Sequence, residues 1–304
     1  MTVTRILLLG ADGQLARELR RELSTLGALV VAGRSIGREH IDFTAPDSVA
    51  GVIERVRPHW IVNAAAHTAV DRAEHERDLA FAVNATTPSV IAKAAAEIGA
   101  LLVHYSTDYV FDGTGARPYR EDAPTAPQSV YGQSKRAGEE AIAASGAAHL
   151  VLRTSWVYGL AGNNFMRTMR RLAREREALR VVADQRGAPT WSRHIAQATA
   201  QMLARLGQDR AAWQRLSGVY HLVSQGETTW HGFAEAIIGH QRRHEPVKVT
   251  CITPIATHEY PLPAPRPAYS VLDTGKLFDT FGIRLPDWRD ALGQVQEELD
   301  REPI

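Results

Sequence analysis

The chain has 304 residues, 44% of them apolar, and its 35 basic and 34 acidic residues leave a net charge of +1. This is enough for one large or two smaller domains with a buried core, and the balanced charge argues against a nucleic-acid partner or a polybasic membrane anchor. The single cysteine, Cys251, excludes an intramolecular disulfide and a cysteine-based metal cluster, and we expect its thiol to be buried.

The first 155 or so residues alternate short apolar runs with longer amphipathic stretches. The expected strands are residues 5–9, 29–32, 59–63, 101–105 and 149–154, and the expected helices cover about 46–56, 73–98 and 131–145. The first apolar run is too short for a secretion signal or a membrane span, so we expect a cytoplasmic protein. The alternation is typical of βαβ units and predicts an α/β fold with a Rossmann-type doubly wound parallel sheet.

After Trp156 the pattern changes to helices separated by short strands and a proline-rich stretch. Helices are expected at 165–179, 193–206, 230–238 and 288–299, with strands at 181–182 and 218–223. Residues 254–267 contain five prolines and are too poor in N–H donors for a central strand, so we expect an ordered loop that lines or covers a site. This part predicts a smaller, discontinuous C-terminal α/β domain.

Gly10, Gly13 and Ala16 follow a predicted strand and open a predicted helix. Glycines allow a tight turn and let a pyrophosphate approach backbone N–H groups at the positive end of the helix. A small residue at the last position allows close packing of the helix. The context favours a dinucleotide-binding turn, and the alternative is an ordinary βα turn.

Arg34 follows the second predicted strand, at a position where an acid would bind the ribose 2′-hydroxyl of NAD. An arginine there could face a 2′-phosphate, which favours NADPH over NADH, although loop arginines are often only solvated. Asp42 and Phe43 follow the next short segment and could pack on the adenine. Residues 63–68 begin at the carboxyl end of a strand, where ligands bind in such sheets, and their alanines would let a cofactor lie against the backbone.

Tyr131 and Lys135 lie four residues apart on a predicted helix, in a chain with only four lysines among its 35 basic residues. Residues at this spacing share a helix face, and a compact ammonium can both hold a ligand hydroxyl and ease deprotonation of a phenol. Thr107 follows a predicted strand, so its hydroxyl could bind the substrate oxygen that Tyr131 protonates. The alternatives are a surface pair and a capping threonine, but together the three predict a proton-transfer site.

Other chemistries have weaker signals. The arginines at 167–176 are interrupted by Glu175 and lack interleaved aromatic residues, so a solvated face is favoured over nucleic-acid binding. There is no Walker A string, no Gly-x-Ser-x-Gly elbow and no His-Glu-x-x-His motif. One histidine- and acid-rich run suggests a metal site, but no fourth ligand is evident and a solvated helix start is favoured. Its members are His67, Asp71, Glu74 and His75.

The turn at 10–16, the Ser-Thr-Asp-Tyr-Val-Phe string at 106–111 and the Tyr131–Lys135 pair together resemble an extended short-chain dehydrogenase/reductase. The resemblance is closer still to the dTDP-4-dehydrorhamnose reductase family. It rests on residues 63–71, 153–158, 162–165, 184–190 and 266–273, and it runs nearly end to end. The segments in the C-terminal part are peculiar to that branch.

This resemblance implies the NAD(P)H-dependent reduction of the C4 keto group of dTDP-4-dehydro-L-rhamnose, which completes dTDP-L-rhamnose synthesis for cell-surface polysaccharides. It implies that Tyr131 donates the proton, that Lys135 binds the nicotinamide ribose and lowers the tyrosine pKa, and that Thr107 tunes the pair. We expect a dinucleotide-binding domain at 1–155 plus about 187–222, and a nucleotide-sugar domain at about 156–186 plus 223–304. The implied substrate contacts are Thr107, Asp108 and Trp156. The expected cofactor contacts are Gly10, Gly13, Gln14, Leu15, Arg34, Asp42, Phe43, Ala66, His67, Thr68, Tyr105, Tyr131 and Lys135.

The chain also departs from the family pattern. Ala16 replaces a common glycine, and Arg193 and His194 stand where the family often has an acidic residue. The second departure puts in doubt a Mg²⁺ site that the family implies at a dimer contact, so Mg²⁺ is not supported by the sequence, while a homodimer remains possible. The open alternatives are a reductase or epimerase of another nucleotide sugar and a non-catalytic, cofactor-binding regulatory homologue.

Overall fold

A seven-stranded parallel sheet forms the centre of the computed structural model, which describes residues 3–34 and 39–301. Its strand order is β11-β6-β5-β4-β1-β2-β3, so the chain runs outward in both directions from the β1–β4 pair. This is the doubly wound arrangement that the sequence predicts, and its ligands bind at the carboxyl ends of the strands near the reversal point. The strands are β1 Arg5–Leu9, β2 Ala28–Gly33, β3 Glu39–His40, β4 Trp60–Asn63, β5 Leu101–Thr107, β6 His149–Thr154 and β11 Gly218–His221.

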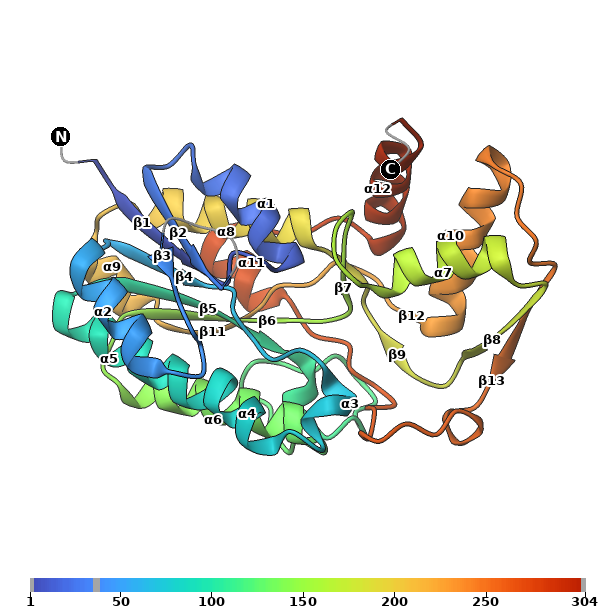
Figure 1. The fold of residues 1–304 in the computed structure, drawn as a ribbon, viewed down its shortest axis with the longest axis horizontal. Coiled ribbons are helices and arrows are strands. Elements are labelled where there is room, and N and C mark those ends of the chain that lie inside the picture. The colour runs from blue at the N-terminus through green and yellow to red at the C-terminus, as the bar shows by residue number, and fades with distance from the viewer. Residues whose placement is uncertain (1–2, 35–38, 302–304) are drawn as a thin grey trace.

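Helices cover both faces of this sheet (Figure 1). On one face, α1 and α8 pack over a core that also takes in apolar residues of α9 and α11; on the other, α2, α5 and α6 pack over a second core. The β strands between the two cores are apolar toward both, as expected of a parallel sheet buried on both faces. The helices are α1 Gln14–Leu23, α2 Pro46–Val56, α3 Val70–Ala73, α4 Arg77–Phe81, α5 Thr87–Ile98, α6 Val130–Ala144, α8 Ser192–Leu206, α9 Arg210–Arg215 and α11 Gly275–Phe281.

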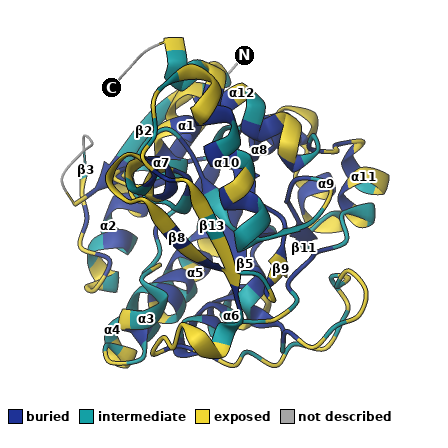
Figure 2. Ribbon diagram, turned by 90° about the vertical axis from the view of Figure 1, so that its right-hand side faces the viewer, coloured by how far each residue is buried: buried dark blue, intermediate teal, exposed yellow. Residues whose placement is uncertain are grey.

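The remaining helices form a smaller unit beside the carboxyl edge of the sheet, on the right of Figure 1. Its own core contains Trp191, Phe233 and Trp288. Figure 2 shows β8 and β13 at its surface, with many exposed residues. No helix within residues 3–34 and 39–301 is long and apolar enough to cross a membrane. The elements are β7 Val157–Tyr158, α7 Phe165–Glu175, β8 Ala178–Val182, β9 Arg186–Gly187, β10 Thr190–Trp191, β12 Thr228–Thr229, α10 Trp230–His244, β13 Cys251–Ile255 and α12 Trp288–Arg301, with short 3-10 turns at Asp108–Val110 and Thr257–Glu259.

The helix expected at 73–98 begins later and is not α-helical throughout. α3 ends at Ala73, and an unbroken helical run from Arg77 to Ile98 then comprises α4, a π-helical turn at Ala82–Thr86 and α5. Pro88, in the first turn of α5, has no N–H to donate to the carbonyl four residues before it, which removes one α-helical hydrogen bond beside the π turn. Asn84 in the π turn is fully buried and binds residues outside the helix, which is typical of π turns near functional sites.

Several details of the C-terminal part also differ from expectation. The helix expected at 165–179 ends at Glu175, because the next residues form β8 and pair with β13. Pro254 lies within β13, which is tolerated because this strand has a partner on one side only. Cys251 is exposed, so the expected buried thiol is also wrong.

A buried ion pair holds α6 against the sheet. Arg153 of β6 donates two hydrogen bonds to Glu139 of α6, from Nε at 2.9 Å and Nη2 at 2.7 Å. Both side chains are 1% exposed. Because both side chains are almost fully buried, water could not solvate either charge if its partner were removed.

Replacing Arg153 by Leu should lower the free energy of unfolding by about 3–5 kcal/mol, because the Glu139 carboxylate would stay buried without its bidentate partner. Urea unfolding at neutral pH measures this change. Arg171, in an exposed pair with Glu175, is the control, and Arg171→Leu should cost less than about 1 kcal/mol. Equal effects of both substitutions would contradict the stabilising role of the buried pair.

Candidate functional site

The turn after β1 packs directly against the loop after β4. Gly10 has a φ of 89°, and a Cβ atom built on it would lie 2.5 Å from the backbone nitrogen of Ala65. No L side chain fits this backbone or this gap, so the glycine is required. The two loops therefore form one continuous floor at the carboxyl edge of the sheet.

The N-terminus of α1 opens onto this floor. Gly13 is its N-cap and provides no side-chain cap, so the positive end of the helix dipole is available to an anion. Leu15 packs partly into the core beneath. Gln14 instead reaches the smaller unit: its Nε2 donates to the Val157 carbonyl at 3.1 Å, and its Oε1 accepts from Asn164 Nδ2 at 3.3 Å.

Arg34 and Asp42 are both exposed beyond the ends of β2 and β3. The Arg34 N–H donates to Asp12 Oδ2 at 3.2 Å. Hydrogen bonds from Thr44 lower the pKa of Asp42, and the charge of Arg34 lowers it further. Phe43 is 7% exposed and belongs to the core under α2 and α5.

The loop after β4 is tied to α6 through Asn84. The side chain of Asn84 accepts from the His67 N–H at 2.9 Å and donates to the His67 carbonyl and to Ser134 Oγ, each at 3.0 Å. Ala66 is half-buried and Thr68 is exposed on the same loop. The π turn that the sequence did not predict thus positions three predicted cofactor contacts.

Three of the four residues considered for a metal site have other partners. His67 Nε2 lies 3.0 Å from Glu76, Asp71 pairs with Arg266 at 2.8 Å, and Glu74 accepts from the Val130 N–H at 2.9 Å. His67 also lies in a loop, so the helical face assumed for the run does not exist. These contacts explain the run as structural ties between the loop, α6 and the C-terminal segment.

Tyr131 lies in the first turn of α6, which Ser129 caps by accepting from the Gly132 N–H at 3.1 Å. Burial raises the pKa of Tyr131 to about 12; a hydrogen bond with Thr107 opposes this rise, and the charge of Asp108 adds to it. Thr107, the last residue of β5, also accepts from the Tyr109 N–H at 3.2 Å. The structure thus brings the predicted Thr107 and Tyr131 together, and Thr107 is a cap as well.

Lys135 lies one turn along α6 and is 1% exposed. Its Nζ donates to the Tyr105 carbonyl at 2.6 Å and lies 3.1 Å from His104 Nε2. Burial lowers the pKa of Lys135 to about 8, while the charge of Glu139 raises it. In this structure the Lys135 ammonium therefore faces the backbone of β5. Tyr105 binds Lys135 through its backbone carbonyl, and its hydroxyl is hydrogen-bonded to Thr199 at 2.7 Å.

His104 and Asn63 extend this buried chain of polar groups, and sequence reasoning missed both roles. Asn63 Oδ1 accepts from the Ala65 N–H at 3.1 Å, so its Nδ2 is directed to His104 Nδ1 at 3.0 Å. His104 is 0% exposed, and burial together with the charge of Lys135 holds its pKa well below the usual value. His104 therefore lies between the Asn63 amide and Lys135 Nζ, with one ring nitrogen near each.

Asp108 follows Thr107 and is 2% exposed. Its Oδ1 accepts from Thr107 at 3.0 Å, whereas Oδ2 has no partner within the described part of the chain. Burial raises the pKa of Asp108 to about 6, although hydrogen bonds from Ser270 and Thr107 lower it. Ser270 comes from the C-terminal segment, a contact with no signal of its own in the sequence.

Trp156 begins the smaller unit with a φ of 45°, which is uncommon for a large side chain. Its ring stacks on Trp230, with centroids 3.5 Å apart, and Trp230 Nε1 donates to Gln185 at 3.2 Å. Trp230 and Gln185 line a cavity of about 560 Å³ whose outer wall is residues 260–266, so the proline-rich segment lines a cavity as predicted. At the end of that wall, Arg266 lies 5.9 Å from the ring of Tyr109, which contacts the ring of Tyr131 edge-on at 5.6 Å.

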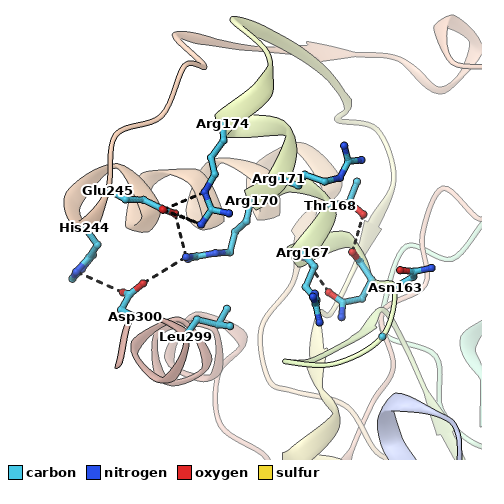
Figure 3. A pocket seen from close by; sticks show the side chains of 12 residues that line it. Asn163, Arg167, Thr168, Arg170, Arg171, Arg174, His244, Glu245, Leu299 and Asp300 are labelled. Carbon is cyan, nitrogen blue, oxygen red and sulfur yellow. Dashed lines mark hydrogen bonds and ion pairs between the residues drawn. The ribbon is translucent and has the colours of Figure 1, made fainter. Parts of the chain in front are cut away.

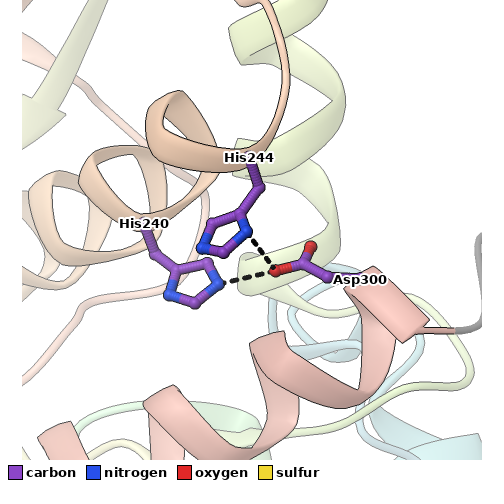
Figure 4. Close-up of side chains that lie close together, drawn as sticks. All are labelled: His240, His244 and Asp300. Carbon is purple, nitrogen blue, oxygen red and sulfur yellow. Dashed lines mark hydrogen bonds and ion pairs between the residues drawn. The ribbon is translucent and has the colours of Figure 1, made fainter.

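A second cavity, of about 610 Å³, lies between α7, α10 and α12 and has no predicted site residue in its lining (Figure 3). Here the arginines of α7 are not simply solvated, as the sequence suggested: Arg170 is 8% exposed and pairs with Glu245 and Asp300. Asp300 also lies 2.8 Å from His240 and 3.6 Å from His244 (Figure 4). Because Arg170 already neutralises this carboxylate, the cluster is explained as packing between helices.

Comparison with known proteins adds a consistent set of relatives. A family model described as the RmlD substrate binding domain matches residues 4–301. The dTDP-4-dehydrorhamnose reductase of Burkholderia thailandensis is 49% identical over 298 residues, covering 97% of this chain and 99% of the relative. That of Escherichia coli K12 is 45% identical, covering 97% of both chains. The crystal structure of the Bacillus anthracis dTDP-4-dehydrorhamnose reductase in complex with NADP superposes with a TM-score of 0.86 at 36% identity, covering 98% of this chain and all of the other.

The raised pKa of Asp108 predicts a pH-dependent stability. The folded protein binds this proton more tightly than the unfolded chain, so the stabilisation is complete below the usual carboxyl pKa and is lost as the pH rises through about 6. The free energy of unfolding of Asp108→Asn, relative to that of wild type, should therefore rise by roughly 2 kcal/mol between about pH 4 and about pH 7. Urea unfolding across this pH range measures the difference. For the control Asp122→Asn, at an exposed position, the difference should not change with pH. A difference that does not change with pH for Asp108→Asn would disprove the raised pKa.

Proposed function

The chain belongs to the dTDP-4-dehydrorhamnose reductase family, and we propose that it reduces the C4 keto group of dTDP-4-dehydro-L-rhamnose to give dTDP-L-rhamnose, with Tyr131 as proton donor. The observation that carries this proposal is the set of Thr107, Tyr131 and a buried Lys135 one turn along α6, at the carboxyl edge of a doubly wound sheet. A protein that only bound a cofactor would have no need of this buried proton-transfer group. The end-to-end match favours this sugar over other nucleotide sugars.

The floor formed by the β1 and β4 loops fits a dinucleotide. Gly10 leaves no side chain over the backbone, and the uncapped N-terminus of α1 offers positive charge to a pyrophosphate. Arg34 would bind the 2′-phosphate, Asp42 the adenosine end, and the loop at 66–68 the part nearer the reaction centre. Bound NADPH would supply the hydride that reduces the keto carbon.

Tyr131 holds the proton that the reaction needs. Its raised pKa keeps the phenol protonated at neutral pH, so it can donate O–H to the alkoxide oxygen that forms at C4. In the structure the Thr107 hydroxyl donates to Asp108 Oδ1, and turning it toward Tyr131 would stabilise the phenolate left behind. Lys135 is held at this edge by Tyr105 and His104, where its ammonium can bind a ribose hydroxyl and favour the phenolate.

The substrate would lie between this edge and the smaller unit. The unpartnered Oδ2 of Asp108 is placed to accept a sugar hydroxyl, and the Trp156 ring, stacked on Trp230, would add an apolar contact to the sugar. The neighbouring cavity combines the apolar wall around Trp230 with the guanidinium of Arg266, which suits a base and a diphosphate. We retain the division into a dinucleotide-binding and a sugar-binding domain, the cytoplasmic location and a homodimer as proposals.

Tyr131→Phe should lower kcat by about 10²–10⁴-fold, because the alkoxide loses its positioned acid. Consumption of NADPH with dTDP-4-dehydro-L-rhamnose, followed by loss of nicotinamide absorbance, measures this. The dissociation constant of NADPH should change little, and Tyr220→Phe, whose hydroxyl donates to the Leu216 carbonyl away from the proposed site, should keep its activity. No consumption by wild type would reject the proposed substrate, whereas equal rates for wild type and Tyr131→Phe would reject only the proton donor.

Arg34→Ala should raise the KM for NADPH about tenfold and leave that for NADH nearly unchanged, as expected on loss of one charge-assisted hydrogen bond to the 2′-phosphate. Steady-state kinetics with each cofactor gives the ratio. Arg20→Ala, at an exposed position of α1, is the matched control. An unchanged ratio of the two KM values would remove Arg34 from cofactor selection.

A further inference from the structure

Three helices meet around a pair of carboxylates at the junction of the two units. Glu18 comes from α1 and Glu298 from α12, and α8 passes between them with Arg193 and His194 in its first turn. The family pattern implies a Mg²⁺ ion in this region, with an acidic residue at one of the two α8 positions. Whether these residues fit a divalent cation can be judged from their contacts.

Arg193 occupies the place between the carboxylates. Its Nε donates to Glu18 Oε2 at 3.1 Å, and its Nη1 donates to Glu298 Oε1. Its guanidinium also stacks on Trp191, 4.7 Å from the ring centroid. The Arg193 side chain is 18% exposed and that of Glu18 is 3% exposed, whereas that of Glu298 is 35% exposed, so the Glu18 end of this ion-pair network is buried and the Glu298 end borders solvent.

The charges of this network already balance without a metal. Glu18 is also 3.6 Å from Arg21, so two guanidinium groups face the carboxylates of Glu18 and Glu298. Burial alone would lower the pKa of Arg193, yet the two carboxylates raise it above its usual value. A Mg²⁺ ion would have to sit against a guanidinium that is permanently charged, and like charges at that distance repel strongly where water is scarce.

His194, the other position considered, supplies no carboxylate either. Its Nε2 lies 3.2 Å from Gln294 Oε1 on α12, and burial lowers its pKa. Mg²⁺ prefers oxygen ligands in a regular octahedron, whereas this junction presents two carboxylates that both already accept from Arg193. The residues present therefore do not fit the ion that the family implies.

We propose that the Arg193 guanidinium is a built-in cation that replaces a divalent metal at the junction of α1, α8 and α12, so that the assembly and stability of this protein are independent of Mg²⁺. The guanidinium supplies the positive charge that the two glutamates need, and its planar fork sets the spacing of α1 and α12 about α8. This property is separate from the reductase reaction, because none of the three residues belongs to the proposed catalytic or cofactor site.

The first test uses the wild-type protein without substrate. Its thermal unfolding midpoint and its molar mass by light scattering are measured in EDTA and in increasing MgCl₂. We expect both quantities to be the same throughout. A saturable rise of the midpoint with Mg²⁺, or a change of mass on its removal, would overturn the proposal.

The second test restores an acidic group. Arg193→Glu should unfold at a lower temperature than wild type in EDTA, and Mg²⁺ should recover much of the loss in a saturable way, because three carboxylates would then face one another. Arg180→Glu reverses the charge of an exposed arginine paired with Glu259 and is the matched control, with no Mg²⁺ response expected. An Arg193→Glu protein that folds but gains no stability from Mg²⁺ would overturn the proposal.

Arg193→Gln keeps the proposal testable if the charge reversal does not fold. This variant should be destabilised in EDTA and should bind Mg²⁺ at least about tenfold more tightly than wild type in calorimetric titration, since the repelling charge is gone while both glutamates remain. Unchanged stability, or a Mg²⁺ affinity equal to that of wild type, would show that Arg193 does not act as the cation.

Discussion

The buried face of α6 is the constraint on which the site depends. Tyr131, Lys135 and Glu139 follow one another at intervals of four residues, so one helix face carries a phenol, an ammonium and a carboxylate. Glu139 is fixed to β6 by Arg153, and Lys135 is fixed to β5 by the Tyr105 carbonyl and His104. Because these ionised groups cannot leave their partners without losing solvation, the helix cannot slide, and Tyr131 stays opposite Thr107.

The same polar contacts join loops that are distant in the sequence. Asn63 and His104 connect the end of β4 to Lys135, and Asn84 connects the following loop to Ser134 on α6. The loops that would hold the cofactor are thus tied to the helix that would carry out proton transfer. Because the cofactor loops and α6 are held by the same contacts, the proposed hydride donor and the proposed proton donor would be positioned relative to each other.

Polar contacts of another kind join the two units. Gln14 spans from the dinucleotide turn to Val157, Asp71 binds Arg266 in the C-terminal segment, and Arg193 links α1 to α12. Each contact joins a residue of the sheet unit to one that packs against the smaller unit.

The sequence by itself determined the parallel sheet, the turn at Gly10 and the Thr107, Tyr131 and Lys135 set, because strand and helix periodicity and glycine geometry are local properties. Only the tertiary structure decided the roles of His104, Asn84, Ser270 and Trp230, which come from separate segments, and the later start and the π turn of the helix expected at 73–98. It also turned the thiol of Cys251 outward. Partners distant along the chain leave no periodic signal, so where a buried polar group finds its hydrogen bonds is determined only when the segments pack together.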